Sequence, residues 1–223
     1  MNQQTTTKLF YDQYAFKVTI VNRLAPIFRN KNWKLSRDVL DKLQIDYENG
    51  LPLIIGRWTK KEPVSENDFI DAKNLFKKFV RNENKFGLRI QYLEINVYSN
   101  EKKWLKKLLK GLHFKDYVFF SPPEEYFQFL IDNKNTIIVS PNFEYEYKIT
   151  FGNNVNSTLA DFLIANRVRF KYSDTLIKDI KSNMSVKGRY IYCKTDKDIM
   201  LLRIAAGNNV SRIDRCVKQT IDK

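Results

Sequence analysis

Two stretches of the chain, YAFKVTIVN at residues 14–22 and YEYKITFGN at residues 145–153, have the pattern of the same β-strand. Apolar and polar residues alternate in both, as expected for a strand that buries one face. Six of the nine aligned positions hold identical or similar residues: Tyr14 and Tyr145, Phe16 and Tyr147, Lys17 and Lys148, Val18 and Ile149, Thr19 and Thr150, Asn22 and Asn153. A strand that recurs at an offset of 131 residues predicts an internal repeat.

A second match follows in the same order, between VYSNEKKWLKKLLKG at residues 97–111 and CKTDKDIMLLRIAAG at residues 193–207. Each stretch reads as the end of a strand, a polar N-cap, an apolar helical stripe and a glycine, Gly111 or Gly207, that can end the helix. This alignment, at an offset of 96, pairs the stripes as follows: Trp104 and Met200, Leu105 and Leu201, Leu108 and Ile204, Leu109 and Ala205.

The two offsets differ by 35 residues, so the first copy is expected to carry an insertion. We assign it to about residues 50–87, where SENDFIDAKNLFKKFV (residues 65–80) predicts a helix with Ser65 as its N-cap. Each copy otherwise reads strand, helix, strand, helix, strand, and the middle strand of the first copy is expected at residues 88–98.

This order predicts an α+β chain of two tandem, duplicated ferredoxin-like units of the βαβ type with antiparallel sheets. The first unit is expected at residues 1–135, with the inserted helix, and the second, shorter unit at residues 136–223. The apolar stretch TIIVS at residues 136–140 is expected either to complete the first sheet or to bridge the two copies.

The chain of 223 residues has a net charge of +14, and such an excess attracts polyanions, nucleic acid first. Residues 1–120 hold 23 Lys and Arg against 13 Asp and Glu, and the remainder holds 16 against 12. No apolar run reaches the roughly 18 residues of a membrane span, and the first residues lack a signal-peptide pattern. We therefore expect a cytoplasmic protein without a membrane span, in the host cytoplasm if the chain is viral.

Residues typical of catalysis are few. His113 is the one histidine, which excludes a two-histidine metal site within one chain, and a capping or surface role is favoured over acid–base chemistry. Cys193 and Cys216 have no CxxC spacing and are expected to be buried, reduced thiols. GxSxG, GxGxxG and GxxxxGK[ST] do not occur. We assign no catalytic residue, metal ligand or cofactor, and an enzyme is not the expected function.

Basic residues interleaved with aromatic ones are the stronger signal, because cations hold phosphates while aromatic rings stack on bases. They occur in FRNKNWK (residues 28–34), in the lysine-rich helix at residues 100–112 and in RVRFKY (residues 167–172). The first and last of these stretches are expected to occupy similar places in the two copies. The predicted nucleic-acid-binding residues are Arg29, Lys31, Trp33, Lys34, Lys102, Lys103, Lys106, Lys107, Lys110, Arg167, Arg169, Lys171 and Tyr172. Trp33 and Phe170 could instead be core residues.

The alternation within the strands predicts which face is open. Tyr14 and Tyr145 are expected on the buried face, with the aliphatic residues, while Lys17 and Lys148 are expected on the other. In RYIYCK (residues 189–194) the tyrosines could lie on either face. No segment has the aromatic-and-glycine signature of an RRM.

The inferred architecture resembles the paired ferredoxin-like domains of several RNA-binding proteins, including CRISPR RNA-processing endonucleases. Those enzymes have a glycine-rich C-terminal loop, which VSRIDRCVKQTIDK (residues 210–223) lacks. The expected function is non-enzymatic binding of nucleic acid, with a single strand favoured, in a viral or phage protein. Two alternatives stay open. The first is a structural or assembly component of a virion or larger complex, with a basic docking surface, and the chain could form a homo-oligomer. The second is an RNA-processing nuclease.

Overall fold

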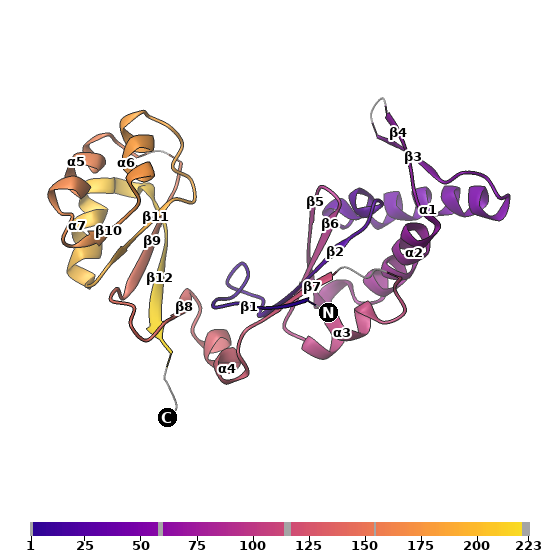
Figure 1. The fold of residues 1–223 in the computed structure, drawn as a ribbon, viewed down its shortest axis with the longest axis horizontal. Helices are drawn as coiled ribbons and strands as arrows, with labels where there is room; N and C mark the ends of the chain where they lie inside the picture. The colour runs from indigo at the N-terminus through magenta and orange to yellow at the C-terminus, as the bar shows by residue number, and fades with distance from the viewer. Residues whose placement is uncertain (1, 58–59, 114–116, 154, 220–223) are drawn as a thin grey trace. The chain divides into compact units, whose positions relative to one another are not determined.

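The computed structural model describes residues 2–57, 60–113, 117–153 and 155–219. The chain forms two compact units, Met1–Asp132 and Asn133–Lys223 (Figure 1). Each unit contains a five-stranded sheet together with several helices, so the chain is of the α+β class, as predicted. No helix among the described residues is long and apolar enough to span a bilayer.

The first unit is built around a sheet with the strand order β1-β7-β2-β6-β5. Its strands are β1 (Asn2–Thr5), β2 (Phe16–Val21), β3 (Ile54–Arg57), β4 (Lys60–Pro63), β5 (Gly87–Gln91), β6 (Glu94–Ser99) and β7 (Tyr117–Ser121). Its helices are the 3-10 helices η1 (Ala25–Lys31) and η2 (Glu83–Lys85) and the α-helices α1 (Trp33–Glu48), α2 (Glu66–Arg81), α3 (Lys102–Leu109) and α4 (Glu124–Asp132). β3 and β4 pair as a separate two-stranded ribbon.

The second unit has a sheet with the strand order β10-β11-β9-β12-β8. Its strands are β8 (Thr136–Val139), β9 (Tyr147–Phe151), β10 (Phe170–Lys171), β11 (Tyr190–Cys193) and β12 (Val210–Lys218). Its helices are α5 (Thr158–Ala165), α6 (Asp174–Lys181), α7 (Asp196–Ala206) and the 3-10 helix η3 (Gly207–Asn209).

Local sequence explains where the main helices begin. The Ser65 hydroxyl accepts the backbone N–H of Asp68 at 3.1 Å and so caps the predicted helix α2. Thr195 caps α7 in the same way, and the Asp198 side chain accepts the backbone N–H of Thr195 in return, which completes a capping box.

One face of the second sheet packs against α5, α6 and α7, which gather on one side of it (Figure 1). The fully buried Ile149, Phe151 and Ile191 point to this side, together with Leu163 of α5 and Leu202 of α7. Because side chains alternate along a strand, the intervening residues of β9 and β11 must lie on the opposite side of the sheet. That side is called the open face below.

The strands of the two sheets are paired in the same way. Lys17 of β2 faces Tyr98 of β6 and Phe120 of β7, and Lys148 of β9 faces Tyr192 of β11 and Asp214 of β12. β1 and β2 therefore correspond to β8 and β9 at the predicted offset of 131, while β6 and β7 correspond to β11 and β12 at an offset of 94.

The offset of 96 predicted for the second match is wrong by two residues. α3 buries Leu105 and Leu108, and at the offset of 94 these correspond to Ile199 and Leu202, which α7 buries. Ile204, the residue predicted to match Leu108, is 81% exposed. The glycines after the two helices caused the error, because α7 has 11 residues and α3 has only 8.

Three further expectations about the strands are wrong. The strand predicted at residues 88–98 is a hairpin of β5 and β6, because the chain turns at Tyr92 with φ 53°. The TIIVS stretch forms β8, which pairs with β12 in the second sheet rather than with the first. Neither sheet is fully antiparallel, since β1 runs parallel to β7 and β8 parallel to β12 at the edge of each sheet.

Candidate nucleic-acid interface

The open face of the second sheet displays tyrosines beside lysine and threonine. Across β9 and β11, Tyr192 faces Lys148 and Tyr190 faces Thr150. Tyr190 is 45% exposed and Tyr192 is half-buried, while the neighbouring Ile191 is fully buried on the helix side. The burial of Ile191 in the core thus forces both tyrosines outward.

Four aromatic rings form a continuous row on this face. The rings of Tyr190 and Tyr192 lie 5.4 Å apart between centroids and are nearly perpendicular. Tyr192 also contacts Phe143 at 5.0 Å and Tyr145 at 6.1 Å, both from the loop between β8 and β9. Tyr145, predicted on the buried face, therefore lies on the open one, because β9 begins only at Tyr147 and the alternation does not extend into the loop.

Lysine ammonium groups lie over these rings. Lys148 Nζ is 3.8 Å from the centroid of Tyr190 and 6.0 Å from that of Tyr192. Lys171 Nζ and Lys194 Nζ lie 5.7 Å and 5.6 Å from the centroid of Tyr145. Cations and stacking surfaces are thus interleaved over β9, β10 and β11, as in sites that grip single strands.

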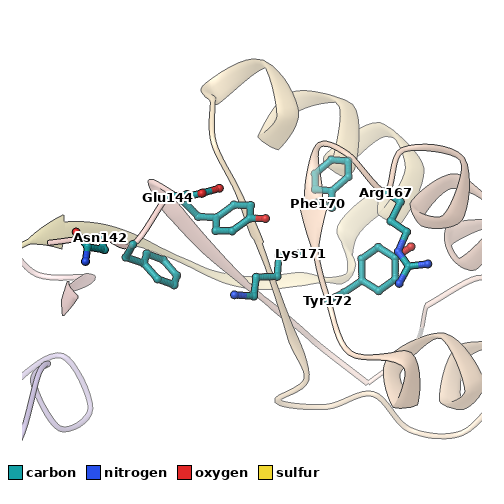
Figure 2. Close-up of a pocket in the computed structure, with 8 residues that line it drawn as sticks. Asn142, Glu144, Arg167, Phe170, Lys171 and Tyr172 are labelled. Carbon is teal, nitrogen blue, oxygen red and sulfur yellow. The ribbon is translucent and has the colours of Figure 1, made fainter. Parts of the chain in front are cut away.

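Two cavities flank Lys171 of β10. The loop-side cavity, of about 490 Å³, is lined by Asn142, Phe143, Glu144, Tyr145, Arg167, Phe170, Lys171 and Tyr172. The helix-side cavity, of about 540 Å³, lies next to the start of α6 and is lined by Lys171, Tyr172, Ser173, Thr175, Gly188, Arg189, Tyr190 and Tyr192. In Figure 2, Arg167 and Tyr172 lie at one end of the loop-side cavity and Asn142 and Glu144 at the other, with Lys171 between them.

Several charges in the second unit are already paired. Arg189 bonds Asp179 at 2.8 Å, Lys194 lies 3.4 Å from Glu144, and the half-buried Arg212 pairs with the buried Asp214. Burial raises the pKa of Tyr192, with the neighbouring Tyr190 as a further cause, so its hydroxyl stays neutral and can donate at pH 7.

The corresponding face of the first unit is covered by its own chain, the loop between β1 and β2. Phe10 packs on Tyr98 at 5.5 Å and on Phe120 at 6.1 Å, and Lys17 Nζ lies 4.0 Å from the Phe120 centroid. Burial lowers the pKa of Lys17. Tyr14, predicted on the buried face, instead lies 6.1 Å from Tyr98 for the same reason as Tyr145.

The structure places the predicted residues of the second unit in two settings. Arg167, Lys171 and Tyr172 meet in the loop-side cavity. Arg169 instead bonds Asp198 at 3.1 Å, at the start of α7. Phe170 is 2% exposed and belongs to the core.

The predicted residues of the FRNKNWK stretch lie in the first unit. Lys31 donates to the backbone carbonyls of Glu83 and Phe86 at 3.0 and 2.9 Å, and Trp33 donates to the Glu83 carboxylate at 2.7 Å. Arg29 and Lys34 are exposed. RVRFKY does not occupy a similar place, because it contains β10, an edge strand paired with β11, whereas FRNKNWK lies in η1 and at the start of α1.

The predicted lysines of α3 form a basic helix face in the first unit. Lys103, Lys106 and Lys107 are exposed, as is Lys110 just after the helix, whereas Lys102 is half-buried with its Nζ 5.9 Å from the Phe16 ring. Lys78 of α2 donates to the carbonyls of Leu108 and Lys110 and so occupies the C-terminal end of α3.

Sequence reasoning left Tyr190, Tyr192, Phe143 and Tyr145 out of the predicted site and placed Lys148 only on an open face. The signal that could have found the two strand tyrosines is YIYC itself, since it alternates around a β-branched residue. The loop aromatics carried no periodicity.

His113 lies beside a buried acid. The fully buried Asp71 of α2 accepts the backbone N–H of His113 at 2.8 Å, and its Oδ1 lies 2.9 Å from the ring Nδ1. This carboxylate holds the segment that follows α3 against α2.

Among the described residues, no three His, Cys, Asp or Glu side chains are arranged to hold a metal ion. Comparisons of the chain with protein-family models, with curated proteins and with solved structures find no match.

Proposed function

We propose that this chain is a non-enzymatic protein that binds single-stranded nucleic acid on the open face of its second unit. The observation that carries the proposal is the row of four aromatic rings with Lys148 3.8 Å above Tyr190 and Lys171 at its edge. Base stacking on exposed rings is worth about 1–3 kcal/mol per base and tolerates any sequence. The rings supply stacking and the lysines supply phosphate contacts.

We further infer that both units are copies of one ferredoxin-like unit. In the second unit, β9 and β10 are joined through α5 and flank β11, while β11 and β12 are joined through α7 and flank β9. The first unit repeats this split βαβ arrangement with β2, β5, β6 and β7. The shared register, with one edge strand parallel to the last strand in each unit, supports a duplication in which extra elements between β2 and β5, among them the β3–β4 ribbon, enlarge the first copy.

A single strand fits this face better than a duplex does. The tyrosines and phenylalanine can stack only on bases whose faces are accessible, which in a duplex are already stacked on each other. An open sheet that presents aromatic side chains is also how RRM domains hold unpaired bases.

The test is a fluorescence-anisotropy titration of the full chain with labelled single-stranded DNA, single-stranded RNA and duplex of one length, at about 50 and 200 mM salt. The proposal predicts tighter binding of a single strand than of the duplex, with affinity falling as salt rises because counterions are displaced. An oligoglutamate of equal charge serves as the matched polyanion and should bind more weakly, since it lacks bases. Equal binding of oligoglutamate, or cleavage of the strand, would contradict the proposal.

A further inference from the structure

The two cavities of the second unit meet at one side chain. Lys171 and Tyr172 line both the loop-side and the helix-side cavity, so Lys171 forms the ridge between them. Each cavity falls within the roughly 300–1,000 Å³ typical of small-ligand sites.

Each cavity also has its own aromatic wall. Phe143 and Tyr145 line the loop-side cavity, and Tyr190 and Tyr192 line the helix-side cavity. The contact between Tyr145 and Tyr192, 6.1 Å between centroids, makes the two walls continuous. Two planar groups can therefore stack side by side with one cation at their boundary.

We propose that this face binds two consecutive nucleotides, one base in each cavity, with the Lys171 ammonium on the phosphate that joins them. The inference rests on the proposed function. It adds that the bound unit is a dinucleotide and that Lys171 contacts the phosphate between its two nucleotides. Lys171 is exposed, and its Nζ lies 5.9 Å and 5.7 Å from the centroids of Phe143 and Tyr145, the aromatic wall of the loop-side cavity. The exposed Arg167 supplies a second cation at the loop-side cavity for a neighbouring phosphate.

The corresponding position of the first unit is built differently. By register, Gly87 of β5 stands where Lys171 stands, since Gly87 faces Tyr98 and Lys171 faces Tyr192. The Tyr14 ring fills the space above Gly87, and an added Cβ there would meet the Tyr14 Cε2 at 2.8 Å. At the position of Lys171 the first unit therefore has a glycine, and the Tyr14 ring lies where the side chain of that residue would begin.

The test compares dithymidine monophosphate with its methylphosphonate analogue, in which the single linkage is uncharged, by NMR titration of the full chain. The wild-type protein is expected to bind the charged dinucleotide roughly threefold to fivefold more tightly than the neutral one, as for one exposed ion pair. In Lys171→Gln this ratio should fall to about one, whereas Lys197→Gln, an exposed lysine of α7, should keep the wild-type ratio.

An unchanged ratio in Lys171→Gln, or thymidine monophosphate binding as tightly as the dinucleotide, would overturn the inference. A twenty-residue thymidine oligonucleotide separates this failure from that of the proposed function. Binding of the long strand with no effect of Lys171 removes only the dinucleotide site. Failure of the wild-type chain to bind the long strand removes the proposed function itself.

Discussion

Lys148 lies over the ring of Tyr190, with its Nζ 3.8 Å from the ring centroid. The two side chains meet because Lys148 faces Tyr192, and Thr150 faces Tyr190, on adjacent antiparallel strands. Tyr190 nevertheless keeps 45% of its surface exposed. The sheet thus holds a cation next to a stacking surface. In a bound nucleotide the ring can stack on the base and the cation can contact the phosphate.

Replacing Lys148 with glutamine should reduce the salt dependence of single-strand binding. One phosphate contact fewer lowers the slope of log affinity against log salt by about 0.7 for a single strand. The measurement is a series of anisotropy titrations at increasing salt. Lys197→Gln is the matched control, because Lys197 is exposed on α7 at the helix side of the same unit. Equal slopes for the two variants would contradict a phosphate contact at Lys148.

Two substitutions in α7 test the register of the proposed repeat. Leu202 is fully buried and corresponds to Leu108 of α3, while Ile204 is 81% exposed. Leu202→Ala should lower the free energy of unfolding by about 2–5 kcal/mol, and Ile204→Ala by no more than about 0.5 kcal/mol. Urea denaturation followed by circular dichroism measures both. A larger loss for Ile204→Ala would restore the offset of 96.

Asp71 should stabilise the first unit through the segment after α3. Asp71→Asn weakens charge-assisted hydrogen bonds to the His113 backbone and ring, at a cost of about 1–3 kcal/mol in unfolding free energy. His113→Ala removes only the ring contact, since the backbone N–H remains, and should cost less. The midpoints of thermal unfolding of the two variants are measured and compared with that of the wild type. If His113→Ala lowers the midpoint as much as Asp71→Asn does, the stabilisation comes from the imidazole contact instead of the backbone contact.

The two cysteines are buried and free, as predicted, and should be unreactive in the folded protein. Burial, with Asp198 and Asp214 nearby, raises the pKa of Cys193 to about 12 and that of Cys216 to about 11. Both thiols are therefore protonated at pH 8, and a disulfide reagent should label them only after denaturation. Fast labelling of the native chain would contradict their burial.

The same pKa shifts give a direction for stability against pH. An unfolded thiol ionises at about pH 8.5, whereas the folded thiols keep their protons to higher pH. Their contribution to stability is thus intact below about pH 8.5 and is lost as the pH rises from there through the folded pKa values of about 11 for Cys216 and about 12 for Cys193.

Elements with an uninterrupted pattern could be predicted from the sequence. The alternation within YAFKVTIVN gave the strand β2, and the polar N-cap with the apolar stripe within residues 193–207 gave the helix α7. The β5–β6 hairpin could not be predicted, because its turn uses Tyr92 in a left-handed conformation rather than glycine or asparagine. Helix length misled the repeat alignment, since an extra turn in α7 displaces the glycine that follows it.

The site was only partly predictable, for a related reason. RVRFKY pointed to Arg167, Lys171 and Tyr172 because cations and rings adjoin in sequence. Tyr190 and Tyr192 depend on which face of β11 the helices cover, and only the packing of Ile191 against them decides that. The aromatics at Phe143 and Tyr145 reach the face through a loop, which has no periodicity to read.

The central claim is tested most directly by measuring the affinity of a labelled single strand for Tyr190→Ala and for Tyr92→Ala. Tyr92 is the matched control, since it is 79% exposed and lies in the β5–β6 turn of the first unit. Loss of one stacking ring should weaken binding by about 1–3 kcal/mol, roughly fivefold to a hundredfold, in Tyr190→Ala, and Tyr92→Ala should bind like the wild type. Equal affinity of the two variants would contradict a nucleic-acid site on the open face of the second sheet.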